Sequence, residues 1–123
     1  KEALKAISEF GAKPYTEDEQ RELSEIVKAF NDRHGTEFTE NDFIRYEPTY
    51  QATLDDDMTD MLRNNAPDVV YSAFSQAFFQ GAIRMFQRDN DMRDIVLTDP
   101  AARDKLIRFF FNRALREVKG DAA

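Results

Sequence analysis

The sequence carries an acidic run whose residue types are suited to binding a divalent cation. Asp55, Asp56, Asp57 and Asp60 supply four carboxylates within six residues, and Ca²⁺ prefers such oxygen ligands. A calcium loop also requires a glycine for its sharp turn and a glutamate at its last position, and no glycine occurs in this run. Consecutive carboxylates near a helix start instead complement the helix dipole. We therefore interpret the run as helix-start charge and predict no metal site.

The single histidine and the glycines add no catalytic or phosphate-binding pattern. The chain contains no cysteine, which excludes disulfides, thiolate zinc sites and cysteine nucleophiles. His34 has no E-x-x-H neighbour and no evident nucleophile to activate, so we expect a helix-end cation or a packing residue. The four glycines are too scattered to form a phosphate-binding loop: Gly11, Gly35, Gly81 and Gly120.

One pair of segments reproduces the letters of a nuclease motif. Pro67-Asp68 and Glu117-Val118-Lys119 match the pattern PD…(D/E)xK, in which carboxylates and a lysine on adjacent strands converge on Mg²⁺. Here both segments are expected at helix termini, with no strand pattern between them. We therefore reject the nuclease interpretation. The sequence predicts no catalytic residue, no cofactor and no metal in this chain, which we do not expect to be an enzyme.

Length, composition and charge limit the kind of fold that could position a functional site. The 123 residues, with 41% hydrophobic residues and 11 Phe, are typical of one folded domain. The net charge of −7 divides into −9 over residues 1–68 and +2 over residues 69–123. This asymmetry is explained either by ordinary solvated helix faces or by a polarised surface that orients a partner. We find no signal peptide and no apolar run long enough for a membrane helix, and expect a cytoplasmic protein.

The apolar residues recur with helical spacing throughout, which predicts an all-α fold, a compact bundle of five or six helices. Residues 1–14 are expected to be the end of a preceding helical segment plus a linker, and residues 15–123 the helical domain. Thr16 with Glu19 forms a capping-box pattern. In the first half of the chain we expect a helix from Thr16 to Gly35, a helix from Thr39 that Pro48 interrupts, and a shorter helix from Tyr50 or Leu54 to Asn64. In the second half we expect a helix from Asp68 to about Asp89 and a brief helix over Met92–Leu97. The last helix begins at Pro100, with Thr98 or Asp99 as its cap.

Two of these helices carry more apolar surface than one face needs. In the 68–89 helix, Phe79 and Ile83 point almost opposite to the main apolar face, and Phe109 does the same in the last helix. Either the 68–89 helix is central and buried on all sides, or Phe79, Ile83 and Phe109 contribute to an apolar docking patch. Ala73, Ala77 and Gly81 form a ridge of small residues that allows another helix to approach closely.

One stretch resembles a known family. Leu23–Phe43, LSEIVKAFNDRHGTEFTENDF, resembles the opening of the C-terminal helical domain of the restriction (R) subunit of type I restriction-modification enzymes. The matching features are Leu23-Ser24-Glu25-Ile26, Phe30-Asn31, Gly35, and Phe38-Thr39 before an acidic helix. The remainder of that domain is similar to Asn64-Asn65, the aromatic helix around Phe74 and Phe78, and Thr98-Asp99-Pro100. The resemblance covers Leu23 to Val118.

The resemblance implies a non-catalytic part of a large enzyme. The full R subunit is an ATP-dependent DNA translocase and endonuclease, and its Mg²⁺, ATP and catalytic residues belong to other domains. This domain is expected to dock the motor subunit onto the methyltransferase core, chiefly onto the modification subunit. Two alternatives are an intramolecular brace on the helicase domains and direct contact with DNA phosphates by the basic half of the chain. The arginines for that DNA contact are Arg84, Arg88, Arg108 and Arg116, joined by Arg93, Arg103 and Arg113.

Overall fold

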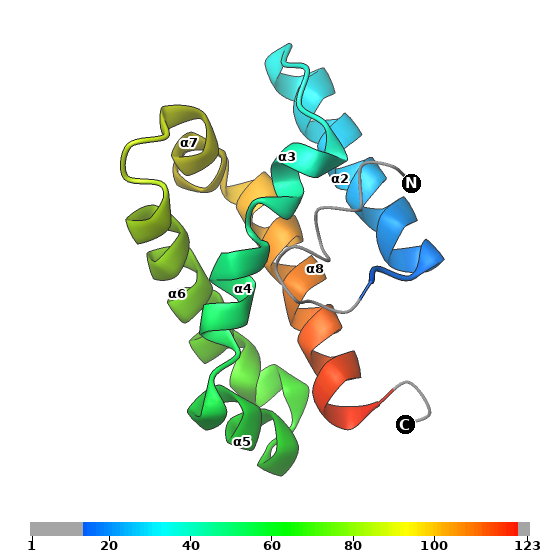
Figure 1. The fold of residues 1–123 in the computed structure, drawn as a ribbon, viewed down its shortest axis with the longest axis vertical. Coiled ribbons are helices and arrows are strands. Elements are labelled where there is room, and N and C mark those ends of the chain that lie inside the picture. The colour runs from blue at the N-terminus through cyan, green and yellow to red at the C-terminus, as the bar shows by residue number, and fades with distance from the viewer. Residues whose placement is uncertain (1–13, 121–123) are drawn as a thin grey trace. The chain divides into compact units, whose positions relative to one another are not determined.

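The computed structural model describes residues 14–120, which form helices and no strand (Figure 1). The prediction of an all-α fold is confirmed, with six helices of seven or more residues and the single-turn helix α3 in the described range. The chain divides into two compact units, Lys1–Pro48 and Thr49–Ala123. The segment expected before Tyr15 lies, except for Pro14, outside the described residues.

The first unit is built on α2 (Glu17–His34). Thr16 caps this helix as predicted: its hydroxyl accepts from the Glu19 backbone N–H at 3.1 Å, and the Glu19 carboxylate accepts from the Thr16 N–H at 2.8 Å. Gly35 ends the helix at φ 65°, a left-handed conformation in which glycine is favoured. His34 lies in the last turn with its ring centroid 4.3 Å from that of Phe30, which agrees with its predicted helix-end position.

Asn31 ties the turn after α2 to the helix. Its amide donates to the Phe38 carbonyl at 2.9 Å, and its carbonyl accepts from the Phe38 N–H at 3.0 Å and from the Thr36 hydroxyl at 2.8 Å. The turn thereby places Thr39 at the start of α3 (Glu40–Ile44), where Thr39 and Asp42 form a second capping box. The rings of Phe30, Phe38 and Phe43 meet edge to face beneath it.

Pro48 does not interrupt a helix, and that prediction is wrong. The break lies at residues 45–46, and Pro48 is the second residue of α4 (Glu47–Thr53). Proline is tolerated there because a first-turn N–H has no partner within the helix. The single helix expected up to Asn64 is therefore two, with Asp55 capping α5 (Asp56–Asn64) by accepting from the Met58 N–H at 2.8 Å. The acidic run thus occupies a helix start, as predicted.

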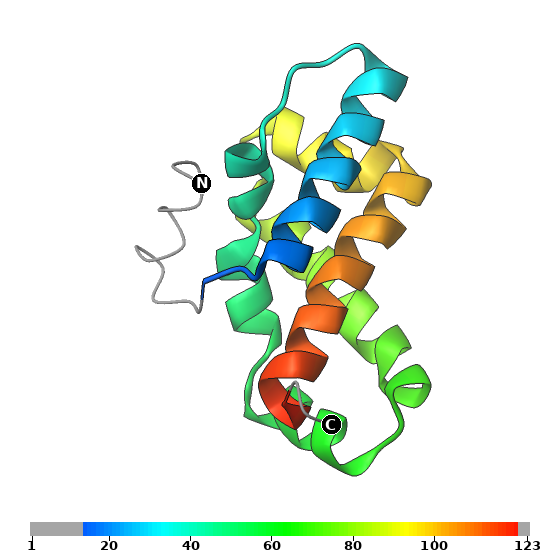
Figure 2. The ribbon, with the colours of Figure 1, turned by 90° about the vertical axis from the view of Figure 1, so that its right-hand side faces the viewer.

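The second unit is completed by α6 (Pro67–Met85), α7 (Asn90–Thr98) and α8 (Pro100–Lys119). Asp89 and Asp99 cap α7 and α8, whereas Ala66 precedes α6 without a side-chain cap. α6 ends four residues earlier than expected. The two long helices α6 and α8 run side by side in opposite directions (Figure 2). Between them, the rings of Phe74, Phe78 and Phe110 stack.

α8, and not α6, is the helix that is buried on most sides. In α6 the buried residues form one row at four-residue intervals: Val70, Phe74, Phe78 and Ala82. Ala77 and Met85, on the same helix, are exposed. In α8 the buried residues cover more than one side: Phe109 is buried, and so are Leu106, Ile107, Phe110, Phe111 and Ala114. The interpretation of α6 as buried all round is therefore wrong. Within the described residues, no helix combines the length and apolarity needed to cross a membrane.

Candidate functional site

The outer side of α6 presents an uncharged row along the whole helix. Val69, Ala73, Ala77, Gly81 and Met85 follow one another at four-residue intervals, so they form a single ridge on the helix surface. At the two ends of the ridge, Val69 is 66% and Met85 45% exposed. The second half of the ridge, Ala77, Gly81 and Met85, lines a groove beside α4.

The first groove, which we call the α4–α6 groove, has a volume of about 430 Å³. Small and flexible side chains line most of it: Thr49, Ala52, Met58, Ala77, Gly81 and Met85, together with the charged Asp55 and Arg84. Gly81 allows α4 to come close, since a Cβ built there would lie 3.4 Å from Thr49 Cγ2. The close helix approach predicted for the small-residue ridge is thus seen at Gly81, and for Ala73 and Ala77 it stays a prediction.

The second groove, the α6–α8 cleft, has a volume of about 450 Å³. Tyr71, Ser72, Ser75, Gln76 and Phe79 line it from α6, and Arg103 lines it from α8. The Arg103 guanidinium carbon lies 5.0 Å from the Phe79 ring centroid, and its Nη1 donates to the Val96 carbonyl at 2.8 Å. These two contacts fix the guanidinium at the edge of the cleft.

A second arginine stacks on the neighbouring ring of the cleft. Arg108 lies 3.8 Å from the Tyr71 ring centroid, and the Tyr71 hydroxyl donates to Asp104 Oδ1 at 3.0 Å. Burial raises the pKa of the Tyr71 hydroxyl above its ordinary value, and the hydrogen bond to Asp104 and the charge of Asp104 raise it further, against lowering by Arg108 and Ser75. The cleft therefore combines the Arg103 guanidinium with aromatic faces and neutral hydroxyls, and Arg108 holds the Tyr71 ring from outside the lining.

The three residues of the predicted docking patch have different surroundings. Phe79 and Ile83 are half-buried on α6, one turn apart, and Phe79 lines the α6–α8 cleft. Phe109 is fully buried, with its ring centroid 5.1 Å from that of Phe110. Its place in an exposed patch is therefore a wrong prediction, because the side of α8 opposite the main apolar face is also covered.

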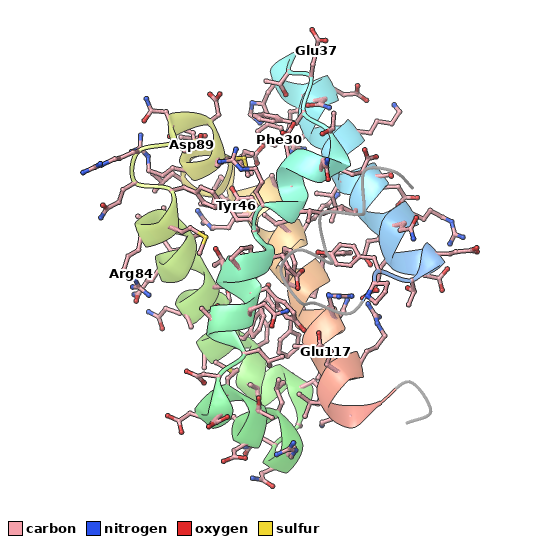
Figure 3. All side chains as sticks on the ribbon, viewed as in Figure 1. Phe30, Glu37, Tyr46, Arg84, Asp89 and Glu117 are labelled. Atoms are coloured by element: carbon pink, nitrogen blue, oxygen red, sulfur yellow. The ribbon has the colours of Figure 1, made fainter. Side chains whose placement is uncertain are left out.

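The predicted phosphate-contact arginines are divided between different surfaces. Arg84 lines the α4–α6 groove and points outward from α6 in Figure 3. Arg88 is exposed beyond the end of α6, Arg108 stacks on Tyr71, and Arg116 is half-buried on α8. Tyr71 and Arg84 are 13 residues apart on α6, a rise of about 20 Å. Of the further arginines, Arg113 is buried and 6.0 Å from the Tyr50 ring centroid.

The two halves of the nuclease-like pattern lie at helix termini, as predicted. Asp68 is in the first turn of α6, and Glu117 and Lys119 are in the last turns of α8. These groups have structural contacts: Glu117 Oε1 accepts from the Tyr50 hydroxyl at 2.9 Å, and Lys119 Nζ donates to the Asn65 carbonyl at 3.3 Å. Across residues 14–120, no group of three or more His, Asp or Glu side chains is arranged to hold a metal ion.

The polar wall of the α6–α8 cleft is not among the features predicted from the sequence. Ser72, Ser75 and Gln76 are polar residues in an otherwise apolar helix, and they share a face with Tyr71 and Phe79 at helical spacing. That mixed face was the available signal.

Comparison of the chain with protein-family models, curated proteins and solved structures gives no match.

Proposed function

We propose that this chain is a non-catalytic assembly domain of a type I restriction R subunit, which docks the motor subunit onto the modification subunit of the methyltransferase core. Two things support the proposal: the sequence resemblance over Leu23–Val118 and the outer surface of α6. The single observation that carries the docking role is the uncharged ridge from Val69 to Met85, whose second half lines the α4–α6 groove. ATP, Mg²⁺ and catalysis belong to other domains of the proposed parent.

The ridge has the geometry that a helix of a partner needs. Rows at four-residue spacing interdigitate with the same rows of a second helix, and small residues at Ala73 and Ala77 let the two backbones approach. Larger apolar side chains at Val69 and Met85 stand at the two ends of the row. A partner helix would therefore be held at its ends and would lie close to α6 in the middle.

A capture experiment with a matched pair of variants tests the proposal. We expect the immobilised chain to retain the methyltransferase complex of modification and specificity subunits, and to compete with the full R subunit for it. Ala77→Glu places a charge in the middle of the ridge and is expected to abolish retention. Ala101→Glu adds the same charge at an exposed position in the first turn of α8 and is expected to leave retention unchanged.

Three outcomes contradict docking. The first is that the wild-type chain neither retains the methyltransferase nor competes with the R subunit. The second is that Ala77→Glu and Ala101→Glu behave alike while both keep the helical circular dichroism of the wild type. The third is strongly salt-dependent binding of nonspecific duplex DNA without methyltransferase binding, which would indicate phosphate contacts by the arginines instead.

A further inference from the structure

We propose that the α6–α8 cleft binds a single carboxylate side chain of a partner protein, with an apolar neighbour of that residue resting on the aromatic rings. The inference rests on the proposed function only in naming the modification subunit as the partner. The binding chemistry itself follows from the residues that line the cleft: Tyr71, Ser72, Ser75, Gln76, Phe79 and Arg103.

Arg103 is the anchor of the proposed site. A guanidinium carries five N–H donors in a planar fork that matches the two oxygens of a carboxylate. The contact with Val96 uses one of these donors, and the Phe79 ring supports the flat face. The remaining edge of the fork lies at a cleft large enough for a side chain. Such charge-assisted pairs are stronger than neutral hydrogen bonds.

The opposite wall supplies neutral hydrogen-bonding groups. The Ser72 and Ser75 hydroxyls and the Gln76 amide come from α6, on the turns that also carry the two aromatic rings. A carboxylate held by Arg103 therefore meets hydroxyl and amide donors, and the methylene groups next to it meet Tyr71 and Phe79. This combination fits Asp or Glu beside an apolar residue in a peptide.

The local charge favours a monoanion over phosphate. Arg103 is the charged residue among those that line the cleft. Arg108 and Asp104 contact Tyr71 from outside this lining, and their opposite charges cancel. The resulting excess of one positive charge is neutralised by one carboxylate. Asp104 repels any anion, but it repels a dianionic phosphate more strongly than a singly charged carboxylate, and a nucleic-acid backbone needs several clustered cations. An acidic protein segment is therefore the occupant that the charges select.

Nuclear magnetic resonance titration of the ¹⁵N-labelled chain tests the inference. The probes are acetyl-Leu-Glu-Leu-amide and its uncharged match, acetyl-Leu-Gln-Leu-amide. We expect the Glu peptide to shift the amide signals of Ser72, Ser75 and Gln76 and the Arg103 Nε signal, and to bind at least tenfold more tightly than the Gln peptide. Equal binding of the two peptides, or shifts confined to other surfaces, would overturn the proposal.

Two variants assign the binding to the cleft. Arg103→Gln is expected to weaken the Glu peptide at least tenfold, whereas Arg88→Gln, at an exposed position outside the cleft, leaves it unchanged. Because Arg103→Gln also removes the Val96 contact, Gln76→Glu provides a second test at an exposed position. It places a like charge in the cleft and is expected to weaken binding at least tenfold, whereas Gln80→Glu, one turn further along α6, has no effect. Loss of affinity in the control variants to the same degree would refute the site.

Two further arms separate the sources of the anion and the two proposals. Inorganic phosphate that bound more tightly than the Glu peptide would show that the cleft is a phosphate site and would overturn the inference. If the Glu peptide binds as expected while the chain fails to capture the methyltransferase, the carboxylate site is supported and the assembly role is contradicted. If capture succeeds and is unaffected by Arg103→Gln and Gln76→Glu, the assembly role is supported and the cleft is not the site that binds the partner.

Discussion

The two long helices α6 and α8 are similar in length and opposite in exposure. α6 has two charged residues among its 19, whereas α8 has eight among its 20. Composition alone would place α6 in the centre, yet α6 buries one row and α8 buries residues on most sides. Long charged side chains on α8 reach solvent from a covered helix, while Ala, Gly and Ser make the outside of α6 apolar or neutral without core packing. An excess of apolar residues therefore does not identify the central helix.

Removing one phenylalanine from each helix is the strongest test of this difference. We expect Phe109→Ala to lower the free energy of unfolding by about 3–5 kcal/mol, since a fully buried ring leaves a cavity. Phe79→Ala, which removes a half-buried ring and its contact with Arg103, is expected to cost about 1 kcal/mol. Urea unfolding followed by circular dichroism measures both. Equal losses would refute the contrast between the helices.

The starts of the two helices offer a second, smaller test. Asp99 accepts from the Ala102 N–H at 3.1 Å at the start of α8, and Ala66 provides no such bond to α6. Asp99→Ala is expected to lower the free energy of unfolding by about 1 kcal/mol, and Ala66→Asp to raise it by about 0.5–1 kcal/mol. Thermal unfolding of the two variants gives the signs. A loss of stability in Ala66→Asp would show that the start of α6 is already satisfied in another way.

Gly81 tests how closely α4 and α6 pack. Its backbone is helical and a Cβ would meet Thr49 Cγ2 at an ordinary contact distance of 3.4 Å. Gly81→Ala is therefore expected to stabilise the chain by roughly 0.5–1 kcal/mol through lower backbone entropy in the unfolded state. Gly35→Ala is the control of opposite sign, because Gly35 has a φ of 65°. Destabilisation by Gly81→Ala would mean that the helices tolerate no added methyl group.

The smallest expected effect is the alkaline titration of Tyr71. Because the neutral phenol is favoured in the folded chain, the pKa lies above 10.0 and the corresponding stability is present below that pH. That stability is lost as the pH rises through the raised pKa. The difference in phenolate absorbance between wild type and Tyr71→Phe should show the titration of Tyr71 above pH 10. Asp104→Asn should move this titration to lower pH. A Tyr71 titration at or below pH 10 would contradict the burial.

The helix starts were predictable because they depend on neighbours in the sequence. Thr16, Thr39 and Asp99 form caps with backbone groups three residues ahead, and this spacing is visible in the sequence. Pro48 was misread because the same residue breaks a helix interior and fits a first turn. The choice between these two roles depends on where the preceding helix ends, and no local cap marked the end of α3 at Ile44.

The candidate site was only partly predictable because it depends on which helices pair. Phe79 was singled out from its helical position, and it does line the cleft. Arg103 was named only among many arginines, since its stacking on Phe79 requires α8 to run antiparallel beside α6. Phe109 was misplaced for the same reason: periodicity gives the direction of a side chain relative to its own helix, and not what covers that direction.

The two arginine–aromatic stacks have a consequence for the thermodynamics of binding. A long side chain loses about 0.5–1.5 kcal/mol of rotamer entropy when a ligand immobilises it. Arg103 and Arg108 are already held against Phe79 and Tyr71, so most of this loss has occurred during folding. Their guanidinium groups would then move little on complex formation, because the fast rotamer motions typical of surface arginines are already restricted by the stacks. The chain thus presents its cations as a rigid template.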